Sequence, residues 1–225
     1  MLIFPNHSRI VFVGDSITDA GRDRSAEPGG WGFGQGYVNH VHNLLTAVYP
    51  DKNLMTINSG VGGDDITQME QRWQSDVLDF EPDFVSVMIG VNDAWRHFDG
   101  TLWQAPTHNE EEFELIYDRL LKLTRSKLPK LQGLIVVSPF MFETNHHESM
   151  RAMVESFSQA AQRVANNNQA LFIDIQADID HFLTRQHPCI ASADHVHPNE
   201  RGAMIVARSW LRATGFDWER DNFDN

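Results

Sequence analysis

Short apolar runs alternate along the chain with longer segments in which apolar residues recur at helical spacing. The short runs are rich in β-branched and aromatic residues and are almost continuously apolar, which is typical of strands buried on both faces. This pattern predicts strands at Ile10–Val13, Leu54–Ile57, Phe84–Ile89, Leu134–Val137 and Leu171–Ile173.

The longer segments keep their apolar residues on one helical face. They predict helices around Tyr37–Val48, Phe113–Thr124, Met150–Val164 and Met204–Leu211. Alternating strands and helices indicate a parallel sheet covered by helices on both faces, and such sheets bind ligands at the carboxyl ends of their strands. Since no stretch resembles a linker, we expect residues 1–225 to form one domain.

Composition and charge exclude several classes of partner. The formal net charge is −13, so neither nucleic acid nor an anionic membrane, which both require a basic face, is expected as a partner. Cys189 is the only cysteine and cannot form an intrachain disulfide. No basic, apolar leader precedes the first predicted strand, and no apolar stretch approaches the roughly 18 residues of a membrane span. We therefore expect a cytoplasmic location.

Four polar stretches lie next to predicted elements of this sheet. Gly14-Asp15-Ser16 follows the first strand, INSGVGGDDI (57–66) overlaps the end of the second, and MIGVNDAWR (88–96) closes the third. The fourth stretch, ADHVHPNERG (193–202), precedes the last helix. Because the carboxyl ends of parallel strands share one edge, we expect the four stretches to meet there.

Each stretch alone has an ordinary structural explanation. Ser16 can cap a helix or form a turn, and the glycines of the second stretch can serve only to allow positive φ. Asn92 and Asp93 can begin a helix. Asp194 and His197 can form a structural hydrogen bond within a loop.

Together the four stretches contain what a serine nucleophile requires. A serine hydroxyl needs a base within hydrogen-bond reach, and an imidazole base needs an acceptor on its other nitrogen. His197 and Asp194, three positions apart, can provide both. The oxyanion of the tetrahedral intermediate needs fixed donors, which a glycine-rich turn and an asparagine side chain can supply.

The Gly-Asp-Ser, the N-x-G-x-x-G turn, the G-x-N-D and the D-x-x-H-P resemble, in order and spacing, the blocks of the SGNH (GDSL-type) hydrolase superfamily from Ile10 to Gly202. This resemblance implies a three-layer α/β/α, flavodoxin-like fold. It implies a catalytic triad of Ser16, Asp194 and His197, and an oxyanion hole formed by Ser16, Gly63 and Asn92. This chemistry requires no cofactor. The chain has no G-x-S-x-G, so the α/β-hydrolase elbow is not the template.

Further motifs narrow the resemblance to the bacterial acetylxylan esterases, which remove acetyl groups from xylo-oligosaccharides and related sugars. These motifs are GDSITDAGR, G-x-G-Y-V (34–38), MIGVNDAWR and SPF (138–140). In that branch an aromatic residue often directly precedes the triad aspartate, whereas this chain has Ala193. The resemblance also implies homo-oligomers. The tail FDWERDNFDN (216–225) is either disordered or a subunit contact, and we favour the contact.

Side chains near the predicted site are candidates for holding an acetylated mono- or oligosaccharide. We expect substrate-binding residues at Asp15, Trp31, Trp95 and Arg96. The two tryptophans are chosen because indole faces pack well on sugar rings; the alternative is that they only cover the rim of the site. Trp103 is expected to pack.

A metal site is the alternative interpretation of His195 and His197 with Asp194, Asp64 and Asp65. Histidines separated by one residue point to opposite sides of an extended segment, and no third histidine or cysteine is close in the sequence. We therefore expect no metal.

Two other functions compete with sugar deacetylation. A broad-specificity esterase, lysophospholipase or thioesterase would use the same groups but usually needs an apolar groove, and no contiguous apolar loop is found. A non-catalytic carbohydrate-binding protein would lack a triad member, and all three are present. We therefore predict a serine esterase that removes acetyl groups from sugars such as xylo-oligosaccharides through an acyl-enzyme on Ser16.

Overall fold

The computed structural model describes residues 1–100 and 107–220, and Trp103 lies outside the described residues. Its centre is a parallel sheet of five strands in the order β2-β1-β3-β4-β5. The strands are β1 (Arg9–Gly14), β2 (Met55–Gly60), β3 (Phe84–Met88), β4 (Gly133–Val137) and β5 (Leu171–Ile173). This order is that of flavodoxin-like sheets, so the predicted fold class is confirmed.

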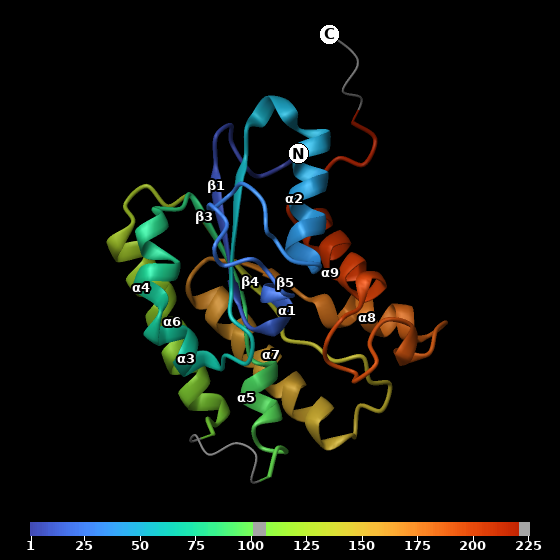
Figure 1. The fold of residues 1–225 in the computed structure, drawn as a ribbon. Coiled ribbons are helices and arrows are strands. Elements are labelled where there is room, and N and C mark those ends of the chain that lie inside the picture. The colour runs from blue at the N-terminus through green and yellow to red at the C-terminus, as the bar shows by residue number, and fades with distance from the viewer. Residues whose placement is uncertain (101–106, 221–225) are drawn as a thin grey trace.

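Helices cover both faces of the sheet (Figure 1). On one side lie α2 (Tyr37–Val48), α8 (Ile175–Leu183) and α9 (Glu200–Ala213). On the other lie α3 (Ile66–Gln71), α4 (Trp73–Asp76) and α6 (Glu110–Lys127), with α7 (Ser149–Asn167) packed beside α6. Within the two described ranges, no helix has the length and apolar character needed to cross a membrane.

Short elements occupy the carboxyl end of the sheet. Helix α1 (Ser16–Asp19) begins two residues after β1, and α5 (Val91–Trp95) begins shortly after β3. The remaining turns are 3₁₀ helices at Pro50–Lys52, Leu78–Phe80 and Pro188–Ile190. All five predicted strands and four predicted helices are present with small shifts at their ends, whereas α1, α3, α4, α5 and α8 were not predicted.

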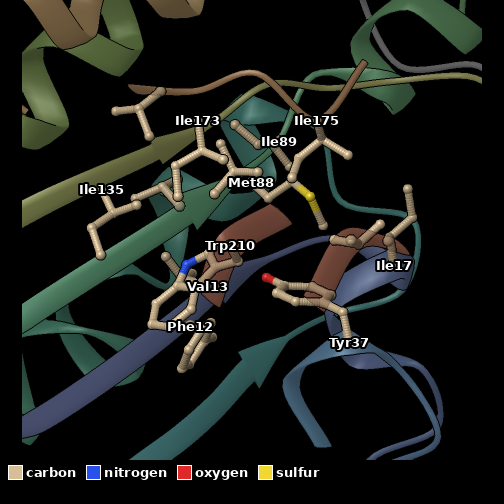
Figure 2. Packing of buried hydrophobic residues seen from close by; sticks show 14 of the residues in the cluster. Phe12, Val13, Ile17, Tyr37, Met88, Ile89, Ile135, Ile173, Ile175 and Trp210 are labelled. Atoms are coloured by element: carbon tan, nitrogen blue, oxygen red, sulfur yellow. The ribbon is translucent and has the colours of Figure 1, made fainter. Parts of the chain in front are cut away.

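A buried tryptophan anchors α9 to the sheet. Trp210 packs against Phe12 of β1, with ring centroids 5.0 Å apart (Figure 2). Its indole N–H donates to the hydroxyl of Ser86 at 3.0 Å. Burial of the indole stabilises the packing of α9 on the sheet, and the hydrogen bond to Ser86 satisfies the one polar atom of the indole. Helix α9, which follows the loop that carries His197, is therefore held against the sheet.

The end of β2 lies unusually close to α1. A Cβ atom on Gly60 would lie 2.1 Å from the backbone nitrogen of Asp19, so only glycine fits. The side chain of Asn58 fixes the same approach, because its amide donates to the carbonyls of Thr18 and Phe33 at 2.7 and 2.9 Å. This packing brings the turn after β2 next to Ser16.

Candidate active site

Ser16 and His197 meet at the carboxyl end of β1. Ser16 is the first residue of α1, and its Oγ lies 2.8 Å from Nε2 of His197, from the loop before α9. This distance is that of a good hydrogen bond, and the hydroxyl donates if Nε2 is the unprotonated ring nitrogen. The pair has the geometry of a nucleophile and its base.

Asp194 determines which ring nitrogen carries the proton. Its Oδ2 lies 2.6 Å from Nδ1 of His197, and its Oδ1 accepts from the N–H groups of Val196 and His197 at 3.0 and 2.8 Å. Partial burial works to raise the pKa of Asp194, but the hydrogen bonds from His197 and Val196 outweigh it and lower the pKa to about 2. An ionised carboxylate can only accept, so Nδ1 donates and Nε2 is left to accept from Ser16.

The loop carrying both residues is closed on itself and tied to its neighbour. An antiparallel bridge joins Ser192 to Pro198, on either side of Asp194 and His197. His195 has a φ of 67°, in the left-handed region, and its Nδ1 lies 3.1 Å from a carboxylate oxygen of Glu143. Sequence reasoning missed Glu143, since nothing near it in the chain indicates a partner in this loop.

The turn after β2 contains Gly63, the predicted second oxyanion donor. Gly63 has a φ of +88°, which glycine adopts without strain, and a Cβ on the adjacent Gly62 would lie 3.9 Å from Cβ of Ser16. Among the described residues, no hydrogen bond uses the N–H of Ser16 or of Gly63. Neither N–H is therefore used up by these bonds, as an oxyanion donor requires.

Asn92, the predicted third donor, lies in α5 with its amide held in one orientation. Its Nδ2 donates to the carbonyl of Asp64 at 2.9 Å, and its Oδ1 accepts from Arg96 at 3.3 Å. The second hydrogen on Nδ2 is not used by that bond. Asn92 therefore keeps one amide hydrogen for a further acceptor, as its predicted role requires.

Arg72 ties the ends of two strands together beneath this site. Its guanidinium donates to the carbonyls of Gly14 and Ser59 at 2.9 and 2.7 Å and to the carboxylate of Asp64 at 2.6 Å. The sequence does not single out Arg72, because the carbonyls that it binds become neighbours only when β1 and β2 pair.

Two buried carboxyl groups lie below the serine. Burial raises the pKa of Asp15 to about 7, against a hydrogen bond from Ile17 and the charge of His197 that lower it. Burial likewise raises the pKa of Asp93 to about 8, although the N–H of Ile66 donates to it. Asp15 is 1% exposed and caps α1, so its carboxylate does not reach the surface here, and its role in substrate binding stays a prediction.

The other predicted substrate-binding residues have different surroundings. Trp95 is half-buried, and its ring lies 5.8 Å from that of His197, so it forms part of the wall beside the base. Trp31 is 78% exposed, and its loop runs along the edge strand β2, where Gly29 lies against Met55 at the opposite end of that strand. The structure therefore does not bring Trp31 to Ser16.

Arg96 lies mostly within the protein. Its side chain is 14% exposed, and its guanidinium donates to protein groups: the carbonyl of Gly63, the side chain of Asn92 and the carboxylate of Asp99. These contacts hold the guanidinium against protein groups, and a role of Arg96 in substrate binding stays a prediction.

A small hollow adjoins the nucleophile. It has a volume of about 130 Å³ and is lined mainly by apolar or small residues together with the reacting pair: Ser16, Ile17, Ala20, Gly36, Tyr37, His197, Pro198 and Ala203. A hollow of this size accommodates a small group and not a long alkyl chain. In the part of the chain that the structure describes, no group of three or more His, Cys, Asp or Glu side chains is placed to hold a metal ion.

Comparisons with known proteins point to one family. Residues 12–205 match the GDSL-like lipase/acylhydrolase family. The chain is 37% identical over 213 residues to an acetylxylan esterase of Geobacillus stearothermophilus, covering 94% of this chain and 96% of that protein. The match to the family spans the serine, the glycine turn, the asparagine and the Asp194–His197 pair.

Solved structures agree. The crystal structure of the Geobacillus stearothermophilus acetylxylan esterase superposes with a TM-score of 0.91 at 35% identity, covering 99% of this chain and 100% of that chain. An α/β hydrolase enzyme from the metagenome of Lake Arreo, Spain, has a TM-score of 0.91 at 36% identity, covering 96% and 99% of the two chains. Catalytic mutants of the Geobacillus esterase replace a serine, an aspartate or a histidine by alanine. Another mutant replaces a tryptophan directly before that aspartate by isoleucine.

Proposed function

The chain belongs to the GDSL-like lipase/acylhydrolase family, and from this premise we propose that it is a serine esterase that removes acetyl groups from acetylated sugars such as xylo-oligosaccharides. The observation that carries the proposal is the contact of Ser16 with His197 at 2.8 Å, backed by Asp194 at 2.6 Å. The serine, aspartate and histidine replaced in the catalytic mutants of the Geobacillus esterase match these residue types, and its aspartate and histidine are likewise three positions apart.

Acylation begins with the hydroxyl of Ser16. Its Oγ attacks the ester carbonyl while Nε2 of His197 takes the proton, and Asp194 stabilises the imidazolium that forms. The negative charge that develops on the carbonyl oxygen is met by the N–H groups of Ser16 and Gly63 and by the amide of Asn92. The bond to the sugar oxygen then breaks, and His197 donates its proton to that oxygen.

Deacylation repeats the cycle with water. A water molecule gives a proton to His197 and attacks the acetyl carbonyl, the same three donors hold the oxyanion, and acetate leaves as Ser16 regains its proton. No other group is needed to balance the two half-reactions. Because its ring lies 5.8 Å from that of His197, we expect Trp95 to contact the leaving sugar.

Sugar specificity is the finer part of the proposal. The hollow of about 130 Å³ at Ser16 favours a short acyl group. The relative that has a tryptophan directly before its catalytic aspartate acts on acetylated xylo-oligosaccharides. This chain has the small, exposed Ala193 at the corresponding place. We therefore expect a more open sugar site and a broader range of acetylated mono- and oligosaccharides.

Replacement of Ser16 tests the proposal. We expect the parent protein to hydrolyse 4-nitrophenyl acetate and peracetylated xylose, and the Ser16→Ala variant to lose both activities without unfolding. Ser126→Ala, on the exposed end of α6, is the matched control and should retain both. Equal turnover by the parent and Ser16→Ala would reject the serine mechanism, and sugar binding without turnover by the parent would favour the carbohydrate-binding alternative.

Two further expectations from the sequence belong to the proposal. Self-association and a cytoplasmic location were expected. The exposed Trp218, near the described end of the chain, offers an apolar group for a subunit contact. Sedimentation of the purified protein and fractionation of the host cell test these expectations.

A further inference from the structure

Arg96 connects two of the three oxyanion donors. Its Nη2 donates to the carbonyl of Gly63 at 3.2 Å and to Oδ1 of Asn92 at 3.3 Å, while its Nη1 contacts Oδ2 of Asp99 at 2.5 Å. Gly63 lies in the turn after β2 and Asn92 in α5, so one guanidinium bridges separate segments. We propose that Arg96 is a positioning residue that fixes the geometry of the oxyanion hole, an inference that rests on the proposed function.

The first step of the argument concerns the amide of Asn92. Its two ends are distinguished by their partners, because a donor from Arg96 faces Oδ1 and the carbonyl of Asp64 faces Nδ2. A flipped amide would place its NH₂ against the guanidinium, donor against donor. Arg96 therefore keeps the free N–H of Asn92 directed away from both partners.

The second step concerns the turn at Gly63. Gly63, with a φ of +88°, has no side chain to pack against its neighbours. Its position therefore depends on the hydrogen bonds of the turn. Two contacts hold the glycines of the turn: Gly62 N–H donates to Asp19 at 3.1 Å, and the carbonyl of Gly63 accepts from Arg96, while the next residue, Asp64, is held by Asn92 and Arg72. Loss of the Arg96 contact would release one side of the turn and let the Gly63 N–H move.

The third step concerns the choice of arginine. Arg96 follows α5 and lies four positions after Asn92, so both side chains leave the same face of the helix. A planar guanidinium can donate in two directions to separate acceptors, whereas a lysine ammonium acts as a point charge on a flexible stem. A lysine at this position would keep the charge but would not hold both acceptors and Asp99 together.

A double-mutant cycle with Asn92 tests the proposal. We expect Arg96→Met to lower kcat on 4-nitrophenyl acetate roughly 10- to 100-fold with KM changed less than about threefold, because misplaced donors weaken transition-state binding. In an Asn92→Ala background, Arg96→Met should lower kcat by a factor that is at least about threefold smaller than in the parent, since the donor that Arg96 orients is already gone. If the decrease in kcat of the double mutant equals the product of the decreases of the two single mutants, the proposal is overturned.

Controls separate positioning from charge and from folding. Arg163→Met removes an exposed arginine that pairs with Glu110 and Glu114 and with none of the proposed site residues, and it should retain kcat. Arg96→Lys should recover only part of the lost kcat, and full recovery would reject positioning. If Arg96→Met fails to fold, Asp99→Asn loosens the same guanidinium and should lower kcat in the same coupled manner. If the Arg96 variants keep the kcat of the parent while Ser16→Ala is inactive, only this inference is overturned. If Ser16→Ala is active, the proposed function is overturned.

Discussion

One carboxylate holds both the ring and the backbone of His197. Oδ2 of Asp194 lies 2.6 Å from Nδ1 of the imidazole, and Oδ1 accepts the N–H of His197 at 2.8 Å. The ring therefore has little freedom to rotate away from Ser16, although both side chains are nearly half exposed. In this protein, hydrogen bonding rather than burial holds the base in place.

Replacing Asp194 by Asn should separate orientation from charge. The amide keeps the size of the carboxylate, but it can stabilise the wrong tautomer and cannot stabilise an imidazolium, so we expect kcat to fall roughly 10³- to 10⁴-fold. Turnover of 4-nitrophenyl acetate measures the loss. The exposed Asp51→Asn is the control and should behave as the parent. A loss of less than about threefold would remove Asp194 from the proposed role.

Truncation of Asn92 should remove one oxyanion donor. We expect Asn92→Ala to lower kcat roughly 10²- to 10³-fold, the usual cost of losing one such donor. Thermal melting of the variant must be measured alongside, because the amide also binds the carbonyl of Asp64. Unchanged melting with unchanged activity would contradict the assignment.

Activity should decline in acid. His197 must be neutral to take the proton of Ser16, so protonation of its ring removes the base. The lowered pKa of Asp194, about 2, means that this carboxylate stays ionised throughout the decline. The measurement is kcat/KM against pH with 4-nitrophenyl acetate, and a flat profile from about pH 5 to about pH 9 would count against His197 as the base.

Asp93 should make stability fall as the pH rises. Burial raises its pKa from 3.8 to about 8, so between these values the folded protein holds a proton that the unfolded chain has released. The stabilisation is complete below pH 3.8 and is lost as the pH approaches about 8. Asp93→Asn resembles the protonated acid, so its melting temperature relative to the parent should rise between pH 5 and pH 8. A constant difference across that range would contradict the shift.

Acyl-chain length should be limited by the hollow at Ser16. A volume of about 130 Å³ suits an acetyl group, and an octanoyl chain would have to leave the hollow and lie in water. We expect kcat/KM for 4-nitrophenyl acetate to exceed that for the octanoate ester by roughly tenfold or more. A preference for octanoate would instead favour the lysophospholipase or thioesterase alternative.

Much of the fold was predictable because its signals are local. Strands buried on both faces must be apolar throughout, as in β3, and amphipathic helices must show helical spacing, as in α2. The helices that were missed have other causes. Helix α5 begins within the G-x-N-D motif, and α1 is only four residues long, so neither carries enough apolar residues to show a period.

By itself, the sequence determined which chemical groups the protein carries and at which end of the sheet they meet. The reason is that the position of each motif relative to its predicted strand can be read from the sequence. Only the tertiary structure decided how those groups are held. Asp15 is buried and caps a helix, Trp31 follows the edge of β2, and Arg96 bridges Gly63 and Asn92. These outcomes depend on contacts between segments far apart in the chain, and burial and hydrogen-bond geometry arise only once those segments pack.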